Sequence, residues 1–124
     1  KDDQALTVYV GDGDNFRHRA VSYRWEVNRE IGSAYRKYYS AGALVVDAVT
    51  LRNRLARPGK WYTEERNVVN DYREKFGEEI KSRFAVIIGA NTQHLKQQTV
   101  AEIDYIEFLS EEEAAADPIP DGER

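Results

Sequence analysis

Residues 20–28 alternate between apolar and polar side chains without a break. One set of positions is apolar (Val21, Tyr23, Trp25 and Val27), and the positions between them are polar (Ser22, Arg24, Glu26 and Asn28). Because successive side chains of a β-strand point to opposite faces, this period of two predicts a strand. We expect it to be half-buried, with the apolar set facing a core and the polar set facing water.

Four more segments carry strand signals. Residues 6–10 alternate in the same way, whereas residues 44–51 and 84–89 are apolar on both sides and rich in β-branched side chains. Such two-sided runs are expected of strands packed between two layers. Residues 99–109 change the face of their apolar positions halfway, which predicts a strand with a β-bulge near Asp104. The chain is therefore predicted to be all-β over residues 1–110.

The segment after Trp61 also has a helical pattern. Val68, Tyr72 and Phe76 recur at four-residue spacing, and Gly77 follows them as a typical C-terminal stop. Thr63 is a residue type that can cap the start of a helix. From the residues alone, strand and helix both remain open for the first half of this segment.

Several of these stretches resemble one bacterial family. Residues 60–77 read KWYTEERNVVNDYREKFG, residues 2–3 are two acids that lead into LTVYV, and residues 21–25 read VSYRW. Residues 84–89 and 102–108 are similar to the last two strands of the same family, which is known as domain of unknown function 3047. The resemblance covers roughly residues 2–109.

Members of that family look like exported proteins built on a jelly-roll β-sandwich related to carbohydrate-binding modules. The resemblance therefore implies a jelly-roll sandwich here, with a strand over residues 60–67 and one short helix over residues 69–76. The loop after the penultimate strand departs from the family pattern, because residues 90–93 read ANTQ and lack its acidic side chains. This departure argues against a metal or ligand role for the loop.

Family members usually have several more strands before the acidic pair at residues 2–3. A sheet that leaves an apolar face uncovered associates readily. We therefore expect a partner chain, or another segment, to complete the sandwich; the alternatives are that the chain is a processed or cleaved remnant, or that it has lost these strands.

Composition narrows the classes of protein. The chain has 124 residues, 41% of them hydrophobic and 11% aromatic, which indicates a globular domain. It has no Cys, so disulfides and thiolate metal sites are excluded. No run of apolar residues is long enough to span a membrane. Since Met is absent even from position 1, we expect that a leading segment was removed, in keeping with a periplasmic or extracellular protein.

Charge is distributed unevenly along the chain, whose formal net charge is −4. Residues 111–124 contain six acids and one base together with two prolines, which predicts an acidic, flexible tail. Residues 17–57 instead contain nine bases and three acids, with aromatic residues between them. This mixture suits a glycan or another anionic polymer, although the same Arg residues would also suit the solvent-facing side of strands. A nucleic acid partner is not expected.

A candidate ligand site lies in the stretch SAYRKYYSAG, which has the composition of a loop. Exposed tyrosines on a loop can stack on sugar rings, and neighbouring Arg side chains can bind acidic groups. The candidate ligand-binding residues are Tyr35, Arg36, Tyr38, Tyr39 and Arg52. Alternatively, these tyrosines cover an open end of the sandwich or meet a partner subunit. Trp25 and Trp61 are expected in the core.

Signals for metal binding and catalysis are weak. Asp12, Asp14 and Asn15 offer oxygen atoms that Ca²⁺ prefers, but the distal Glu of an EF-hand loop is missing, and the same residues suit a hairpin turn. His18 and His94 are the two histidines, and neither lies in a catalytic motif. We therefore predict no catalytic residues, no metal site and no cofactor.

Three functional hypotheses follow. The first is a non-catalytic exported module that binds a glycan or another anionic ligand. The second is a structural or assembly subunit whose sandwich is completed by a partner chain. The third is a polysaccharide lyase or hydrolase that uses one of the two histidines.

Overall fold

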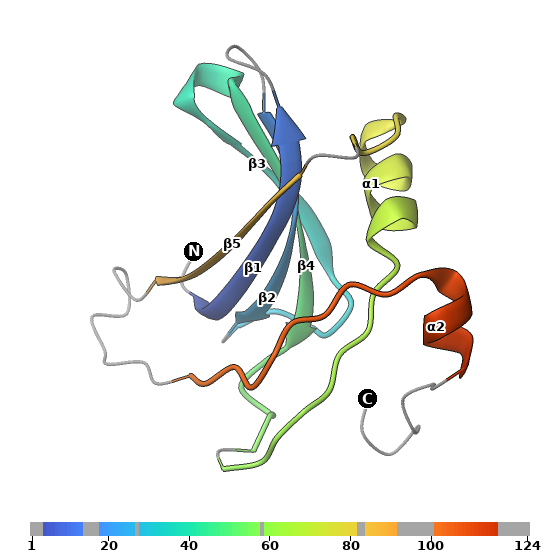
Figure 1. Cartoon of the computed structure of the whole chain (residues 1–124). Coiled ribbons are helices and arrows are strands. Elements are labelled where there is room, and N and C mark those ends of the chain that lie inside the picture. The colour runs from blue at the N-terminus through green and yellow to red at the C-terminus, as the bar shows by residue number, and fades with distance from the viewer. Residues whose placement is uncertain are drawn as a thin grey trace.

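The structure is a computed structural model that describes residues 4–13, 18–26, 28–57, 59–81, 84–91 and 101–116. Five strands form a single mixed sheet in the order β3-β4-β2-β1-β5 (Figure 1). The strands are β1 (Gln4–Gly13), β2 (His18–Glu26), β3 (Ala34–Tyr39), β4 (Leu44–Arg52) and β5 (Ala85–Asn91). Two short α-helices, α1 (Val68–Phe76) and α2 (Glu111–Ala116), and a 3-10 turn, η1 (Ser40–Gly42), accompany the sheet.

All neighbouring strands are antiparallel except β2 and β4, which run parallel. The predicted mostly-β architecture is confirmed. The described residues contain one sheet and no second sheet packed against it, so the jelly-roll sandwich is not seen in this part of the chain.

The core lies between one face of the sheet and α1. Its buried residues come from three adjacent strands and the helix, namely Val10, Val21, Tyr23, Val49 and Tyr72. Val21 and Tyr23 stand opposite Val10 and Val8 in the β1–β2 register, so the apolar set of β2 meets the apolar set of β1. The sequence predicted this apolar face correctly.

Hydrogen bonds hold α1 on the sheet. The Tyr72 hydroxyl donates to an Asp12 carboxylate oxygen at 2.7 Å, and the Tyr23 hydroxyl donates to Asp71 at 2.5 Å. Burial, followed by the bond to Asp71, raises the pKa of Tyr23 well above its ordinary value, because both favour the neutral phenol. Each of these bonds joins residues that are far apart in sequence.

The ends of α1 follow common capping rules. The Asn67 side chain accepts a hydrogen bond from the Asn70 N–H at 3.0 Å, and Gly77 ends the helix in the left-handed conformation. The predicted helix over residues 69–76 is therefore confirmed to within one residue. Its cap is Asn67 rather than Thr63.

Three segments differ in secondary structure from what the sequence predicted. Residues 60–67 contain no strand; they are irregular and are held to β2 and β4 by side chains, through a Trp25–Tyr62 ring contact and an Arg52–Glu64 ion pair. Residues 35–39 form a strand instead of a loop, because their backbone pairs with β4. Residues 101–110 contain no strand, so the bulge expected near Asp104 has no counterpart.

Two further expectations concern burial and the tail. Trp61 is 63% exposed and does not belong to the core, whereas Trp25 is partly buried. Residues 111–116, the described part of the predicted acidic tail, form the short helix α2. Ser110 and Glu113 form a reciprocal pair of hydrogen bonds between side chain and backbone, which is a capping box that starts this helix. Residues 117–124 lie outside the described residues.

Shortening Val21 should destabilise the fold. Val21 is fully buried in the core, so Val21→Ala removes buried methyl groups and leaves a cavity that costs about 2 to 3 kcal/mol of unfolding free energy. Urea denaturation followed by circular dichroism would measure the change. Val69→Ala on the exposed side of α1 is the matched control. Equal losses in the two variants would contradict the placement of the core.

Candidate functional site

The five candidate ligand residues do not gather at one surface. Side chains alternate along β3, so Tyr35 and Tyr39 lie on one face of the sheet while Arg36 and Tyr38 lie on the other. Arg52 is at the end of β4. A stacking platform made of all three tyrosines is therefore incompatible with the strand geometry.

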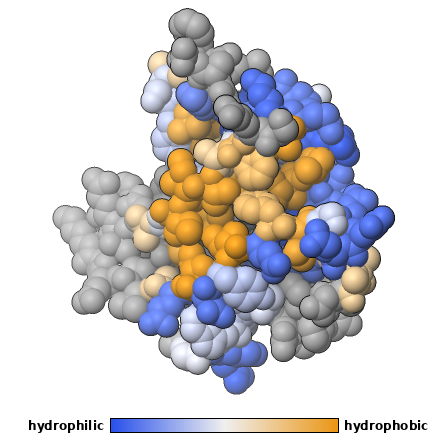
Figure 2. All heavy atoms as spheres, in the orientation of Figure 1, coloured by the Kyte–Doolittle hydropathy of each residue, from blue (hydrophilic) through white to orange (hydrophobic). Residues whose placement is uncertain are grey.

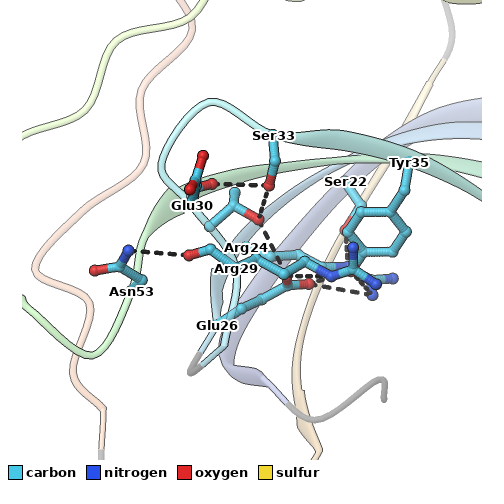
Figure 3. A network of polar contacts seen from close by, with 9 residues as sticks. Ser22, Arg24, Glu26, Arg29, Glu30, Ser33, Tyr35 and Asn53 are labelled. Carbon is cyan, nitrogen blue, oxygen red and sulfur yellow. Dashed lines mark hydrogen bonds and ion pairs between the residues drawn. The ribbon is translucent and has the colours of Figure 1, made fainter.

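A buried polar layer occupies the face of the sheet opposite α1. Its centre is Arg24, whose side chain is 0% exposed (Figure 3). The Arg24 guanidinium donates to Ser22 Oγ at 2.7 Å, to the Tyr35 hydroxyl at 2.9 Å and to the Tyr9 hydroxyl at 3.3 Å. The guanidinium carbon also lies 5.6 Å from the ring centres of both Tyr9 and Tyr35, within cation–π range.

Glu26 supplies the opposite charge to this layer. Its carboxylate lies 3.7 Å from the Arg24 guanidinium and 3.2 Å from that of Arg29. It also accepts hydrogen bonds from the hydroxyls of Thr50 and Tyr35. The pKa of Tyr35 is raised above its ordinary value by burial and then by the hydrogen bond to Glu26. The layer is thus a network in which Arg24 and Arg29 share the Glu26 carboxylate as their anionic partner.

This layer corrects the prediction of a half-buried strand. Ser22, Arg24 and Glu26, expected to face water, are all buried. Two tyrosines from β1 and β3 reach Arg24, which removes it from solvent while satisfying its donors. No sequence pattern separates an Arg under such a cover from one in water, because the cover comes from strands 15 and 11 residues away.

The two cations among the candidate ligand-binding residues, Arg36 and Arg52, are also paired. Arg36 forms a two-pronged contact with the Asp47 carboxylate, at 2.5 and 3.0 Å, and donates to the Lys75 carbonyl at 2.7 Å. The hydrogen bond to Asp47 raises the pKa of Arg36. Arg52 pairs with Glu64, and its guanidinium carbon lies 4.7 Å from the Tyr62 ring centre. An anionic ligand would have to compete with these carboxylates.

Of the weak metal and catalytic candidates, Asp12 and His18 lie within the described residues. Asp12 accepts hydrogen bonds from the Tyr72 hydroxyl and from the Lys81 N–H, both at 2.7 Å. His18 begins β2 and is exposed. Asp14, Asn15 and His94 lie outside the described residues. Within those residues, no three His, Cys, Asp or Glu side chains are placed to hold a metal ion together.

The most unusual surface is apolar. Nine of the fourteen large apolar side chains that are exposed among the described residues fall in residues 84–88 or 103–109. They are Phe84, Val86, Ile87, Ile88, Ile103, Tyr105, Ile106, Phe108 and Leu109. Figure 2 shows a continuous apolar area in the middle of the face that carries β5 in Figure 1. We call these nine side chains the apolar surface.

β5 contributes to this surface on both of its faces. Ile87 is 59% exposed and Ile88 is 53% exposed, although neighbouring side chains of a strand point in opposite directions. β5 pairs with β1 on one side and forms an edge of the sheet on the other. The run AVII was predicted correctly as a strand but wrongly as one packed between two layers.

The two edges of the sheet differ in their protection. β3 carries the cations Arg36 and Lys37, and charged side chains are a common defence of an edge strand against pairing with other chains. β5 reads AVIIGAN and carries no charge. Among the described strands, β5 therefore leaves one edge of the sheet open for pairing, and sequence reasoning missed it because edge position depends on the order of strands.

Neither α1 nor α2, the α-helices in the part of the chain that is described, is long and apolar enough to cross a membrane. A family model described as "Protein of unknown function (DUF3047)" matches residues 2–107. Neither the search of curated proteins nor that of solved structures gave a match.

Removing the positive charge of Arg24 should be costly. In Arg24→Met the buried Glu26 carboxylate loses its fully buried cation and keeps only the partly exposed Arg29, which is expected to lower the unfolding free energy by about 3 to 5 kcal/mol. The matched control is Arg29→Met, which removes a partly exposed cation from the same carboxylate and should cost less than about 1 kcal/mol. Urea denaturation of both variants would test this, and similar losses would argue against Arg24 as the centre of the layer.

Proposed function

This chain belongs to the DUF3047 family, whose description assigns no function, and from its geometry we propose that it is a non-catalytic assembly subunit. It associates through the open edge of β5 with a second copy of itself. The observation that carries this proposal is the uncharged edge strand whose apolar side chains are exposed on both faces. Exposed edges of this kind pair with other strands.

Symmetry supports a second copy as the partner. Antiparallel pairing of one strand with the same strand of another molecule is self-complementary, so it closes a dimer around a two-fold axis. In a seven-residue strand such as β5, the axis falls near the middle residue, Ile88. No charged side chain of β5 would face its own copy across the axis, so no like-charge repulsion opposes the pairing.

The jelly-roll sandwich implied by the family resemblance requires a second layer beyond the single sheet of the described residues. We infer that a second layer covers the part of the apolar surface on one face of β5 in the assembled protein, since water-exposed apolar patches of this kind mark contact sites. Export from the cytoplasm, expected from the same resemblance, stays a prediction.

Placing a charge at the centre of β5 should weaken the dimer. Ile88→Lys loses the burial of an Ile side chain, worth about 1.5 to 3 kcal/mol, and sets two cations against each other at the axis. The dissociation constant is expected to rise roughly 10- to 100-fold. Native mass spectrometry and sedimentation over a range of concentrations would measure it.

Leu55→Lys is the matched control, because Leu55 is exposed and lies outside the apolar surface. Its dimer should resemble that of the unchanged chain. A protein that remains a 14.3 kDa monomer at all concentrations would refute assembly with a second copy.

We keep glycan binding as a second candidate, favoured by one observation. Tyr38 is 64% exposed on the outer strand β3, on the same face as Arg36. An exposed tyrosine beside a guanidinium can stack on a sugar ring and orient an acidic group.

If Tyr38 stacks on sugars, Tyr38→Ala should abolish binding to polygalacturonate, a uronate polymer, while the unfolding transition stays unchanged. Isothermal titration calorimetry would measure the binding. Trp61→Ala is the comparison, because Trp61 is a similarly exposed aromatic residue outside β3. Binding that survives Tyr38→Ala would remove this candidate.

A further inference from the structure

Residues 101–109 carry an apolar pattern that the structure leaves uncovered. All five of their large apolar side chains are exposed, and the segment is paired with no strand of the sheet. Yet Phe108 touches Phe84, the residue just before β5, with 5.2 Å between the ring centres. One end of the segment is therefore held beside the beginning of the open edge.

This contact points to a register for pairing between the segment and β5. If the segment pairs antiparallel with β5 from Phe84 opposite Phe108, then Val86 lies opposite Ile106 and Ile87 lies opposite Tyr105. The two side chains of each pair are exposed, apolar and on the same face as each other, the arrangement that stabilises neighbouring strands. Asn91, the last residue of β5, then lies opposite Ala101, so that residues 92–100 are the connection between the two strands.

The structure supports the direction of this pairing. In Figure 1, residues 101–110 lead toward α2 and run in roughly the opposite direction to β5. The capping box of Ser110 and Glu113 ends the extended segment at the point where the proposed pairing would also end. Closing requires the segment to swing onto the edge of β5 about the Phe84–Phe108 contact.

We propose that residues 101–109 are a strap that docks on β5 as a sixth strand and competes with a second copy of the chain for that edge. In the strap-closed form the chain is a monomer. In the strap-open form residues 101–109 leave the edge of β5 uncovered, and β5 can pair with a second copy of the chain. The competition rests on the proposed assembly at β5, whereas the docking of the strap does not. The strap would thus regulate assembly by covering the backbone groups through which β5 pairs.

Disulfide trapping tests the register. Because the chain has no native Cys, only the two introduced thiols can form a disulfide. In the full chain, Val86→Cys combined with Ile106→Cys puts two thiols directly opposite each other, at a spacing that a disulfide can bridge. Mild oxidation should give a disulfide within one chain, seen as a monomer of altered mobility on a non-reducing gel. The control, Ile87→Cys with Ile106→Cys, puts the thiols on opposite faces and should remain reduced.

Each outcome of the disulfide trapping either supports or refutes the docking of the strap. A disulfide that joins two chains would overturn docking within one chain, and equal oxidation of both pairs, or of neither, would overturn the register. Hydrogen exchange on the unchanged protein gives a reading that needs no substitution: alternate amides of residues 101–109 should be protected. Full exchange at unprotected rates in the monomer would also refute the strap.

The trapped protein then tests regulation. Locked by its disulfide, it should lose the dimer, and reduction should restore it. Trapping within a chain that never dimerises would leave the strap standing and refute the proposed assembly. A locked chain that still dimerises would refute the competition.

Discussion

The burial of Arg24 on the central strand β2 is the constraint on which the sheet depends. A guanidinium that is fully removed from water needs both compensating charge and hydrogen-bond acceptors. Glu26 supplies the charge, and Ser22, Tyr9 and Tyr35 supply oxygen atoms. Because these partners come from β1, β2 and β3, satisfying one side chain fixes the relative positions of three strands.

The opposite face of β2 is organised by a different principle. There Val21 and Tyr23 pack against α1, and the Tyr23–Asp71 and Tyr72–Asp12 hydrogen bonds set the position of the helix. The central strand is therefore covered twice, by an aromatic and ionic layer on one side and by an apolar core on the other. The edge strand β5 has neither cover, and its apolar side chains are exposed. We therefore propose β5 as the surface for association.

The distribution of charge supports the same division. The two Arg residues predicted to bind an anionic ligand are occupied by carboxylates of their own chain, Arg36 by Asp47 and Arg52 by Glu64. Their role in holding β3, β4 and the irregular segment after β4 is visible in the contacts. The uncharged strand β5, in contrast, has exposed side chains whose only route out of water is contact with another segment or another chain.

The local elements whose signals are short in range could be predicted from the amino-acid sequence. We predicted strands from the alternation of residues 20–28 and from the apolar run at residues 84–89, and a helix that ends at Gly77. These predictions were possible because period and capping are properties of neighbouring residues. Tertiary structure alone decided that Arg24 is buried, that Tyr35 and Tyr38 lie on opposite faces, and that β5 is an edge. Each of these depends on which strands become neighbours, and that order is set by contacts between residues far apart in the chain.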